Sequence, residues 1–222
     1  MSHNHNLANF KLNRGFLIAV EGIDGAGKSS LLNILVNLLQ AQNLPVILTC
    51  EPGGTPLGQK LRQILQARAV PACAKAEYFL FAADRAQHFE TVIIPQLKLN
   101  QLVISDRMAD SSLVYQGYGR GLELDKIKFV NQWAMHNLKP DLVLYLRLDP
   151  ATAYTRLAQR AQALKTELSS FEKEQADFMT RIAQGFDQIF TSRTDVLILD
   201  GTLTSADLAQ QAATKILELV KN

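Results

Sequence analysis

The feature that most constrains the fold of this 222-residue chain is a glycine-rich segment between two kinds of apolar pattern. The continuous apolar run Phe16–Val20 precedes the segment GIDGAGKS, Gly22–Ser29, and leucines then recur every three or four positions through Ser29–Gln42. This order predicts a buried strand, a tight loop and a helix. Glycines let the backbone N–H groups of such a loop turn inward around a phosphate, and the helix N-terminus adds partial positive charge. The segment therefore predicts a phosphate-binding loop.

Two side chains of this loop have roles in phosphate chemistry. Lys28 can reach the β- and γ-phosphates of a nucleoside triphosphate, and the hydroxyl of Ser29 can coordinate Mg²⁺. We therefore expect ATP and magnesium to bind at this loop. The expected ATP-binding residues are Gly22, Ile23, Asp24, Gly25, Ala26, Gly27, Lys28, Ser29 and Ser30.

A later apolar run, Leu102–Ser105, ends in an acid followed by a base, Asp106 and Arg107. A carboxylate at the end of a strand beside a phosphate loop is a usual partner of magnesium, so Ser29 and Asp106 are the expected metal residues. The planar guanidinium of Arg107 can bridge a donor and an acceptor phosphate. An isolated Asp-Arg pair is more often a surface ion pair, but its position at a strand end favours the functional interpretation.

Short apolar runs alternate with longer helical patterns, which is typical of a parallel sheet covered by helices. The predicted strands are Phe16–Val20, Val46–Thr49, Leu102–Ser105, Leu142–Leu146 and Val196–Leu199. The predicted helices are Ser29–Gln42, Glu77–Gln101 (ended or kinked by Pro95), Asp125–Leu138, Ala151–Phe190 (interrupted near Thr166–Ser170) and Ser205–Val220. We expect residues 15–222 to form one three-layer, doubly wound α/β domain of the P-loop NTPase class, after a disordered or extended segment 1–14.

Composition argues against several classes of protein. Lysine and arginine exceed aspartate and glutamate by only 23 − 21 = +2, so no nucleic-acid partner is expected. The apolar runs are far shorter than the roughly 20 residues that cross a bilayer, and the first residues lack the order of a secretory signal. Two cysteines, Cys50 and Cys73, predict reduced thiols in a cytoplasmic protein.

The class of nucleotide-binding protein can be narrowed further. GTPases recognise guanine with an Asn-Lys-x-Asp motif, and this chain has none, because Asn137, Lys139 and Asp141 have the wrong spacing. A small-molecule kinase instead needs a second anion site beside the phosphate loop. Arg107 is positioned to form one, so the sequence favours a kinase.

Five motifs occur in the order and approximate spacing of bacterial thymidylate kinases: EGIDGAGKSS, EPGGTPLG, FLFAADRAQH, SDRMADSSLVYQGYGRG and the strand PDLVLYL. The chain resembles this family from about Gly15 to Phe190. The resemblance implies phosphorylation of deoxythymidine monophosphate (dTMP) by MgATP. It also implies a sheet ordered 2-3-1-4-5, a helical lid at about 156–172 and a homodimer.

The resemblance assigns the acceptor base to the FAADR motif. Phe81 and Arg85 are four residues apart and share one face of a helix. By resemblance, Phe81 stacks on thymine and Arg85 donates to its exocyclic oxygen, which would exclude cytosine. Core packing is the alternative role for Phe81. Glu51, in a tight loop after the second predicted strand, is also counted among the substrate-binding residues.

The sugar and phosphate of the acceptor are assigned in the same way. Tyr115 resembles the family's tyrosine that lies under the sugar and leaves no room for a ribose 2′-hydroxyl. Gln116 resembles a glutamine of the family that lies near the base and the sugar. Ser111 and Ser112 lie where the family has small polar residues near the base, with turn or helix-cap roles as the alternative. Asp24 resembles an acid of the family that binds two groups: the sugar hydroxyl of the acceptor and the arginine that corresponds to Arg107.

The chain departs from the family pattern at three places. Cys50 replaces an arginine, so either another base holds the acceptor phosphate or the affinity is lower. Met108 replaces an aromatic residue or histidine, and Ser169–Ser170 replace an Asp-Arg pair of the lid. Arg156 and Arg160 remain available on one helical face, although a solvated basic face is the alternative.

The sequence thus predicts a dTMP kinase that transfers the γ-phosphate of ATP in line. The expected catalytic residues are Lys28, Arg107, Asp24, Arg156 and Arg160. Two alternatives remain: a kinase for another pyrimidine monophosphate such as dUMP, and a nucleotide-binding regulatory protein without turnover.

Overall fold

The computed structural model describes residues 12–67, 72–165 and 176–221. Within these ranges five parallel strands form a sheet ordered β2-β3-β1-β4-β5, which confirms the expected order. The strands are β1 (Phe16–Glu21), β2 (Val46–Cys50), β3 (Leu102–Asp106), β4 (Leu142–Arg147) and β5 (Val196–Asp200). Each predicted strand is present and extends one residue further at its carboxyl end.

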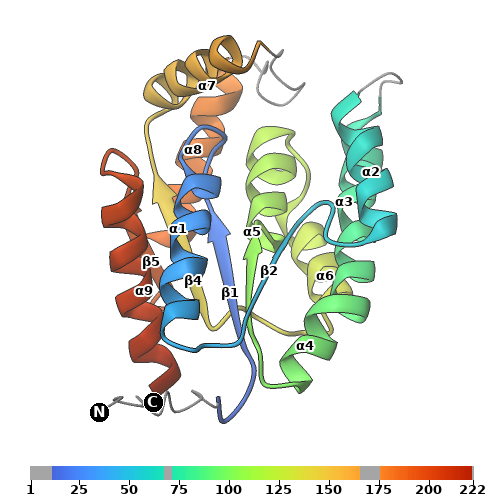
Figure 1. Ribbon diagram of the computed structural model, residues 1–222. Helices are drawn as coiled ribbons and strands as arrows, with labels where there is room; N and C mark the ends of the chain where they lie inside the picture. The colour runs from blue at the N-terminus through green and yellow to red at the C-terminus, as the bar shows by residue number, and fades with distance from the viewer. Residues whose placement is uncertain (1–11, 68–71, 166–175, 222) are drawn as a thin grey trace, which may run out of the picture.

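Helices cover both faces of the sheet (Figure 1). They are α1 (Lys28–Ala41), α2 (Pro56–Ala67), α3 (Ala74–His88), α4 (Ile94–Lys98), α5 (Ala109–Ser112), α6 (Leu124–Ala134), α7 (Pro150–Leu164), α8 (Ala176–Phe190) and α9 (Ser205–Lys221), with π-helical turns η1 (Phe89–Ile93) and η2 (Leu113–Gly119). Helices α1 and α9 pack together on one face, whereas α8 packs against η2 and β4 on the other. Helix α7 lies across the end of the sheet where the chain enters α1 (Figure 1).

The core lies at the central strands. Every residue of β1 is buried, as expected for a strand covered on both faces. On α1, Leu31, Leu35 and Leu39 are fully buried, while small residues such as Ala209 and Ala212 are buried on α9. This packing holds β1 and the start of α1 in fixed relation, and the phosphate loop joins the two.

The structure differs from the helix predictions at three places. Helix α2 was missed because it begins with Pro56 and includes Gly58, two residue types that are typical of turns. Of the two outcomes expected at Pro95, an end or a kink, the structure excludes the end, because the helical segment continues to Lys98 after the π-helical turn η1. A π turn shifts the hydrogen-bonding pattern, so the missing N–H of proline can be accommodated. Residues 109–119, for which no helix was predicted, form α5 and η2.

Some expectations lie outside the described residues. Residues 1–11 belong to this group, whereas Leu12 is buried in the core. The break expected near Thr166–Ser170 also lies outside, and so do the two serines Ser169 and Ser170. Among the described residues, no helix is long and apolar enough to span a membrane.

Candidate active site

A cavity of about 710 Å³ lies at the carboxyl ends of β1, β2 and β3, within the size range of nucleotide and cofactor sites. Ligands of open α/β sheets bind at this edge. The predicted site residues that line the cavity are Asp24, Gly25, Gly27, Lys28, Ser29, Ser30, Glu51, Phe81, Arg85, Asp106, Arg107, Ser111, Ser112, Tyr115, Gln116, Arg156 and Arg160. Gly22, Ile23 and Ala26 belong to the loop but do not line the cavity.

The phosphate loop needs glycine at two tightly enclosed positions. Gly22 has a φ of +143° and Gly25 a φ of +86°. A Cβ at Gly22 would lie 2.6 Å from the carbonyl oxygen of Leu146, and one at Gly25 would lie 2.5 Å from that of Ala153. Larger residues are therefore excluded, and the loop backbone stays close to β4 and α7.

Lys28 begins α1 and is 7% exposed. Its Nζ donates to the carbonyl oxygens of Gly22 and Ile23, at 3.0 Å each. Burial, with the nearby charge of Arg107, lowers the pKa of Lys28 to about 8, against the opposing effect of Asp24 and other acids. The ammonium is thus held over the loop, where an anionic phosphate would favour its charged form.

Asp106 ends β3, one strand away from the phosphate loop. Its Oδ1 atom is buried and has no hydrogen-bond partner among the described residues. Such an oxygen is costly unless a cation or a water satisfies it. Within the same residues, no cluster of three or more His, Cys, Asp or Glu side chains could hold a metal. This donor set fits magnesium, which is usually held by one or two carboxylates plus waters and substrate phosphates.

Arg107 connects the phosphate loop to the segment that follows β3. Its Nη2 donates to Asp24 Oδ1 at 2.7 Å and to Tyr115 Oη at 3.3 Å, and its Nη1 donates to Ser111 Oγ at 3.0 Å. Burial disfavours the charged form of Asp24, but the charges of Arg107 and Lys28 outweigh it and hold the pKa of Asp24 below its usual value. The two residues therefore form an ion pair in the lining of the cavity.

The FAADR motif lies on α3 at the other end of the cavity. Phe81 is half-buried, and Arg85 is 2% exposed. Arg85 donates from Nε to Glu51 Oε2 at 2.8 Å, from Nη1 to Asn131 Oδ1 at 2.7 Å, and from Nη2 to Ser112 Oγ at 3.1 Å. The guanidinium is fixed in the cavity wall, and one N–H of Nη1 has no partner among the described residues.

Glu51 is almost fully buried and binds two side chains of α3. Its Oε2 accepts from Arg85, and its Oε1 lies 3.1 Å from His88 Nδ1. His88 Nε2 in turn lies 2.6 Å from Thr49 Oγ1. Sequence reasoning missed His88 and Asn131, because three separate elements bring this buried polar network together. The geometry of Glu51 is that of a residue that orients Arg85.

Tyr115 and Gln116 lie on η2 and are almost fully buried. Burial raises the pKa of Tyr115 well above its usual value, so its hydroxyl stays protonated. Gln116 Nε2 donates to Glu77 Oε1 at 3.1 Å. Both side chains are thus held in place where they border the cavity.

Helix α7 contributes Arg156 and Arg160 to the lining of the cavity. Arg156 Nη1 donates to the carbonyl oxygen of Gly201 at 2.8 Å, which directs it toward the loop between β5 and α9. Arg160 is exposed, and its charge helps to lower the pKa of Asp24. Both arginines therefore add positive charge beside the phosphate loop.

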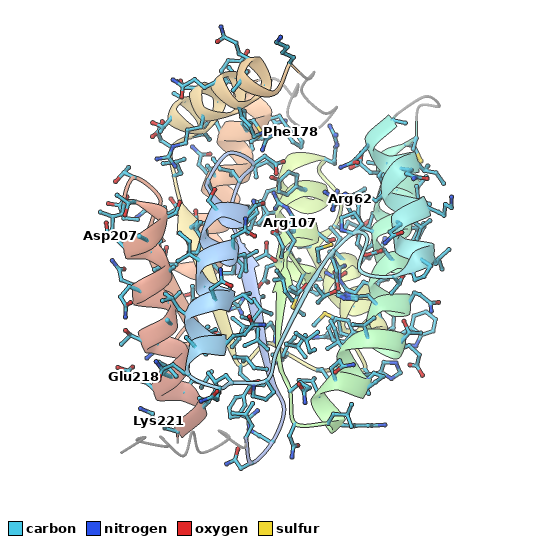
Figure 2. The ribbon with its side chains drawn as sticks, viewed as in Figure 1. Arg62, Arg107, Phe178, Asp207, Glu218 and Lys221 are labelled. Carbon is cyan, nitrogen blue, oxygen red and sulfur yellow. The ribbon has the colours of Figure 1, made fainter. Side chains whose placement is uncertain are left out.

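Sequence reasoning also missed Arg62, because α2 was not predicted. Arg62 lines the cavity near Cys50, and its Nη1 donates to the carbonyl oxygen of Pro52 at 2.8 Å. Burial raises the pKa of the Cys50 thiol, while the charge of Arg62 acts in the opposite direction. Figure 2 shows Arg62 and Arg107 in the space between α1 and α2.

Comparison with known proteins identifies the family. The thymidylate kinase family model matches residues 20–212. Thymidylate kinase of Halothermothrix orenii is 40% identical over 185 residues, which cover 83% of this chain and 88% of that protein. Thymidylate kinase of Lactobacillus delbrueckii subsp. bulgaricus is 38% identical over 212 residues, which cover 94% of this chain and 97% of that protein. The crystal structure of thymidylate kinase from Ehrlichia chaffeensis superposes with a TM-score of 0.70 at 26% identity, covering 92% of this chain and 99% of that one. The chain belongs to the thymidylate kinase family.

Proposed function

We propose that this protein transfers the γ-phosphoryl group of ATP to the 5′-phosphate of dTMP and thereby forms the diphosphate. The observation that carries the proposal is the arrangement of the cavity. The phosphate loop forms one end, Phe81 and Arg85 form the other, and Arg107 lies between them. The names of the relatives support the same reaction.

The residues between the two ends would act by charge and position. Lys28 and the N-terminus of α1 would bind the phosphates of ATP, and Arg107 would hold the donor and acceptor phosphates together. Catalysis of phosphoryl transfer rests on such positioning and on charge complementary to the transferring group. The acceptor phosphate is already anionic, so the transfer needs no general base.

Magnesium would bind with ATP at Ser29 and Asp106. The buried, unpartnered Oδ1 of Asp106 supports this assignment. When bound, the ion neutralises charge on the β- and γ-phosphates. Ser29 is exposed at the start of α1, where its hydroxyl can reach a phosphate-bound cation.

The acceptor subsite would select both base and sugar. Phe81 would stack on thymine, and Arg85, with Ser112 and Gln116 beside it, would contact the edge of the base. Tyr115 would fill the space that a ribose 2′-hydroxyl needs. The fixed geometry of Arg85 supports this role, because a donor held by Glu51 and Asn131 cannot turn away from a mismatched base.

The remaining parts of the proposal concern the lid, the domain and the assembly. Arg156 and Arg160 would act from a lid at about 156–172, of which residues 166–172 lie outside the described residues, within a single domain of residues 15–222. A homodimer would form through α2, α3 and α6, which are neighbours in the fold and lie on one side of it (Figure 1). Large apolar side chains are exposed there, including Phe129 at 68% and Trp133 at 77%. The free cysteines Cys50 and Cys73 support a cytoplasmic location.

Release of ADP from MgATP across a panel of monophosphates tests the function. We expect fast turnover with dTMP, slower turnover with dUMP and poor turnover with dCMP, UMP and purine acceptors. The variant Lys28→Met is the control, because activity that survives it comes from a contaminating kinase. Tight ATP binding without transfer to any acceptor would instead support a regulatory protein.

A further inference from the structure

Glu21, the last residue of β1, is fully buried and does not line the cavity. Its carboxylate accepts hydrogen bonds from the segment that follows β3. Oε1 lies 2.9 Å from the backbone nitrogen of Met108 and 3.3 Å from that of Ser111, and Oε2 lies 2.5 Å from Ser111 Oγ. A buried carboxylate is costly unless it is satisfied in this way. Glu21 thus fastens the segment after Asp106 to the central strand.

The segment that Glu21 fastens begins with an unusual backbone turn at Arg107. Arg107 has a φ of +69°, in the left-handed region that residues other than glycine rarely adopt. Its backbone nitrogen donates to the carbonyl oxygen of Val20 at 2.9 Å, and Ser105 Oγ donates to its carbonyl oxygen at 2.8 Å. The contacts of Glu21 with Met108 and Ser111 secure the chain just beyond this turn. Together these contacts hold Arg107 in its left-handed conformation.

Ser111 connects Glu21 to the guanidinium of Arg107. A serine hydroxyl has one proton to donate and two lone pairs that accept. Because Ser111 Oγ donates its proton to Glu21, it presents its lone pairs to Arg107 Nη1, which lies 3.0 Å away. The carboxylate therefore sets the direction of the hydrogen bond that holds one arm of the guanidinium, while Asp24 holds the other.

We infer that Glu21 is a positioning residue for phosphoryl transfer, which holds Arg107 in place through Met108 and Ser111. This inference rests on the proposed function and on the role of Arg107 in it. Glu21 does not line the cavity, so we expect its effect on the reaction to pass mainly through the arginine. Loss of its carboxylate is expected to lower kcat, with a smaller effect on the affinity for ATP, because the charge of Glu21 also favours the charged form of Lys28.

A double-mutant cycle of Glu21→Gln with Arg107→Ala tests the inference. Glutamine keeps one acceptor oxygen, but its amide nitrogen cannot accept the proton of Ser111. Burial raises the pKa of Glu21 to about 7, so the assays are run at about pH 8, where the carboxylate is ionised. Misplacement of a reacting group by about 1 Å can cost about 10²-fold in rate, and a fall in kcat of this order is expected. In the Arg107→Ala background, the same substitution should change kcat by less than about twofold.

A second pair of variants keeps the test valid if Glu21→Gln does not fold. Ser111→Ala removes the hydroxyl that connects Glu21 to Arg107, whereas Ser111→Thr retains it. We expect Ser111→Ala to lower kcat and Ser111→Thr to restore most of it. Asp141→Asn is the matched control. Like Glu21, Asp141 accepts a backbone N–H, but its donor is Leu17 of β1, at 2.8 Å and at the opposite end of the sheet. That variant should lower the thermal midpoint and leave kcat unchanged.

Two results would overturn the inference. One is an equal fall in kcat for Glu21→Gln with and without Arg107, and the other is full activity of Ser111→Ala. If the wild-type protein itself releases no ADP with dTMP, the proposed function fails and the inference fails with it. An active wild-type protein with additive substitutions would overturn only the role of Glu21.

Discussion

Asp24 and Arg107 lie 83 positions apart in the sequence, yet Asp24 Oδ1 and Arg107 Nη2 are 2.7 Å apart. Parallel pairing of β1 with β3 brings them together, because Val20 is in register with Asp106. The ion pair joins the phosphate loop to the segment after β3. It thereby places a guanidinium between the two predicted phosphate subsites.

Arg107→Ala is expected to lower kcat by about 10³-fold or more, the scale seen when an arginine that stabilises phosphoryl transfer is removed. Affinity for ATP should change little, because Lys28 and the loop backbone remain. Steady-state kinetics and calorimetric titration with a non-hydrolysable ATP analogue measure the two quantities. Arg147→Ala is the control, since Arg147 is 59% exposed and pairs only with Asp187 among the described residues. Unchanged turnover in Arg107→Ala would remove its bridging role.

Tyr115→Ala is expected to narrow the preference for dTMP over its ribose counterpart. The ring of Tyr115 is held edge-on against Phe178 and Phe186, so it cannot move aside for a 2′-hydroxyl. Tyr115→Phe retains the ring and should retain the preference, which separates the steric effect from loss of the hydroxyl. The measurement is kcat/KM for both acceptors. An equal ratio in all three proteins would mean that another residue excludes ribose.

Arg62→Met is expected to raise KM for dTMP with little change in KM for ATP. Arg62 lines the cavity near Cys50, where the family has an arginine, and the described residues give it a single side-chain hydrogen bond, from Nη1 to the carbonyl oxygen of Pro52. Hydrogen bonds to charged groups contribute about 1.5–3 kcal/mol, so a rise of about tenfold or more is expected. Lys60→Met is the control, because Lys60 is exposed on α2 but does not line the cavity. A KM unaffected by Arg62→Met would mean that Arg62 does not replace the missing arginine.

Trp133→Lys is expected to convert a homodimer into a monomer. Trp133 and Phe129 are exposed on α6 beside α3, and a lysine at the centre of such a face would place a charge in the interface. Light scattering on a sizing column measures the mass of both proteins. Tyr154→Lys on α7 is the control for an exposed aromatic residue elsewhere, at 59% exposure. A monomeric wild-type protein would contradict the proposed assembly.

The parts of this molecule that sequence predicted are those with local causes. Each strand is a short apolar run, and the phosphate loop needs glycines at fixed spacing, so both can be identified without tertiary information. The resemblance pointed to Asp24 and Arg107 together, but only the register of β1 and β3 explains their contact. For the strands and the phosphate loop, residue type and spacing within one element are enough for a prediction.

The parts that sequence missed depend on packing between elements. His88 and Glu51 form one buried network only because α3 packs beside the end of β2. Glu21 looked like part of the phosphate-loop motif, although its partners come from the segment after β3. Polar residues that are satisfied by distant backbone groups have no periodic signal in the sequence.

Asp84→Asn is expected to change how stability depends on pH. Asp84 is fully buried, and burial raises its pKa to about 6. The negative charge of Glu51 raises this pKa further. The hydrogen bond from the backbone N–H of Gly53 and the charges of His88 and Arg85 act in the opposite direction. Its Oδ1 accepts from the nitrogen of Gly53 at 3.0 Å, whereas Oδ2 has no hydrogen-bond partner among the described residues. The ionised form is therefore the unfavourable one in the folded protein.

The direction in which stability changes with pH follows from proton binding to Asp84. An unfolded aspartate has a pKa of about 3.9, so between about pH 4 and about pH 6 the folded protein holds a proton that the unfolded chain has lost. The contribution of Asp84 to stability is thus present at low pH and is lost as pH rises through this window. Asparagine cannot titrate, so the free energy of unfolding of Asp84→Asn should rise relative to wild type, on the order of 2 kcal/mol across the window.

Urea unfolding across this pH range, at one protein concentration, measures the difference. Asp125→Asn is the control, because the side chain of Asp125 is 97% exposed and its replacement should give a nearly constant difference. A constant difference for Asp84→Asn as well would show that Asp84 is ionised throughout the window, and that the loop at Gly53 accepts a buried charge without cost.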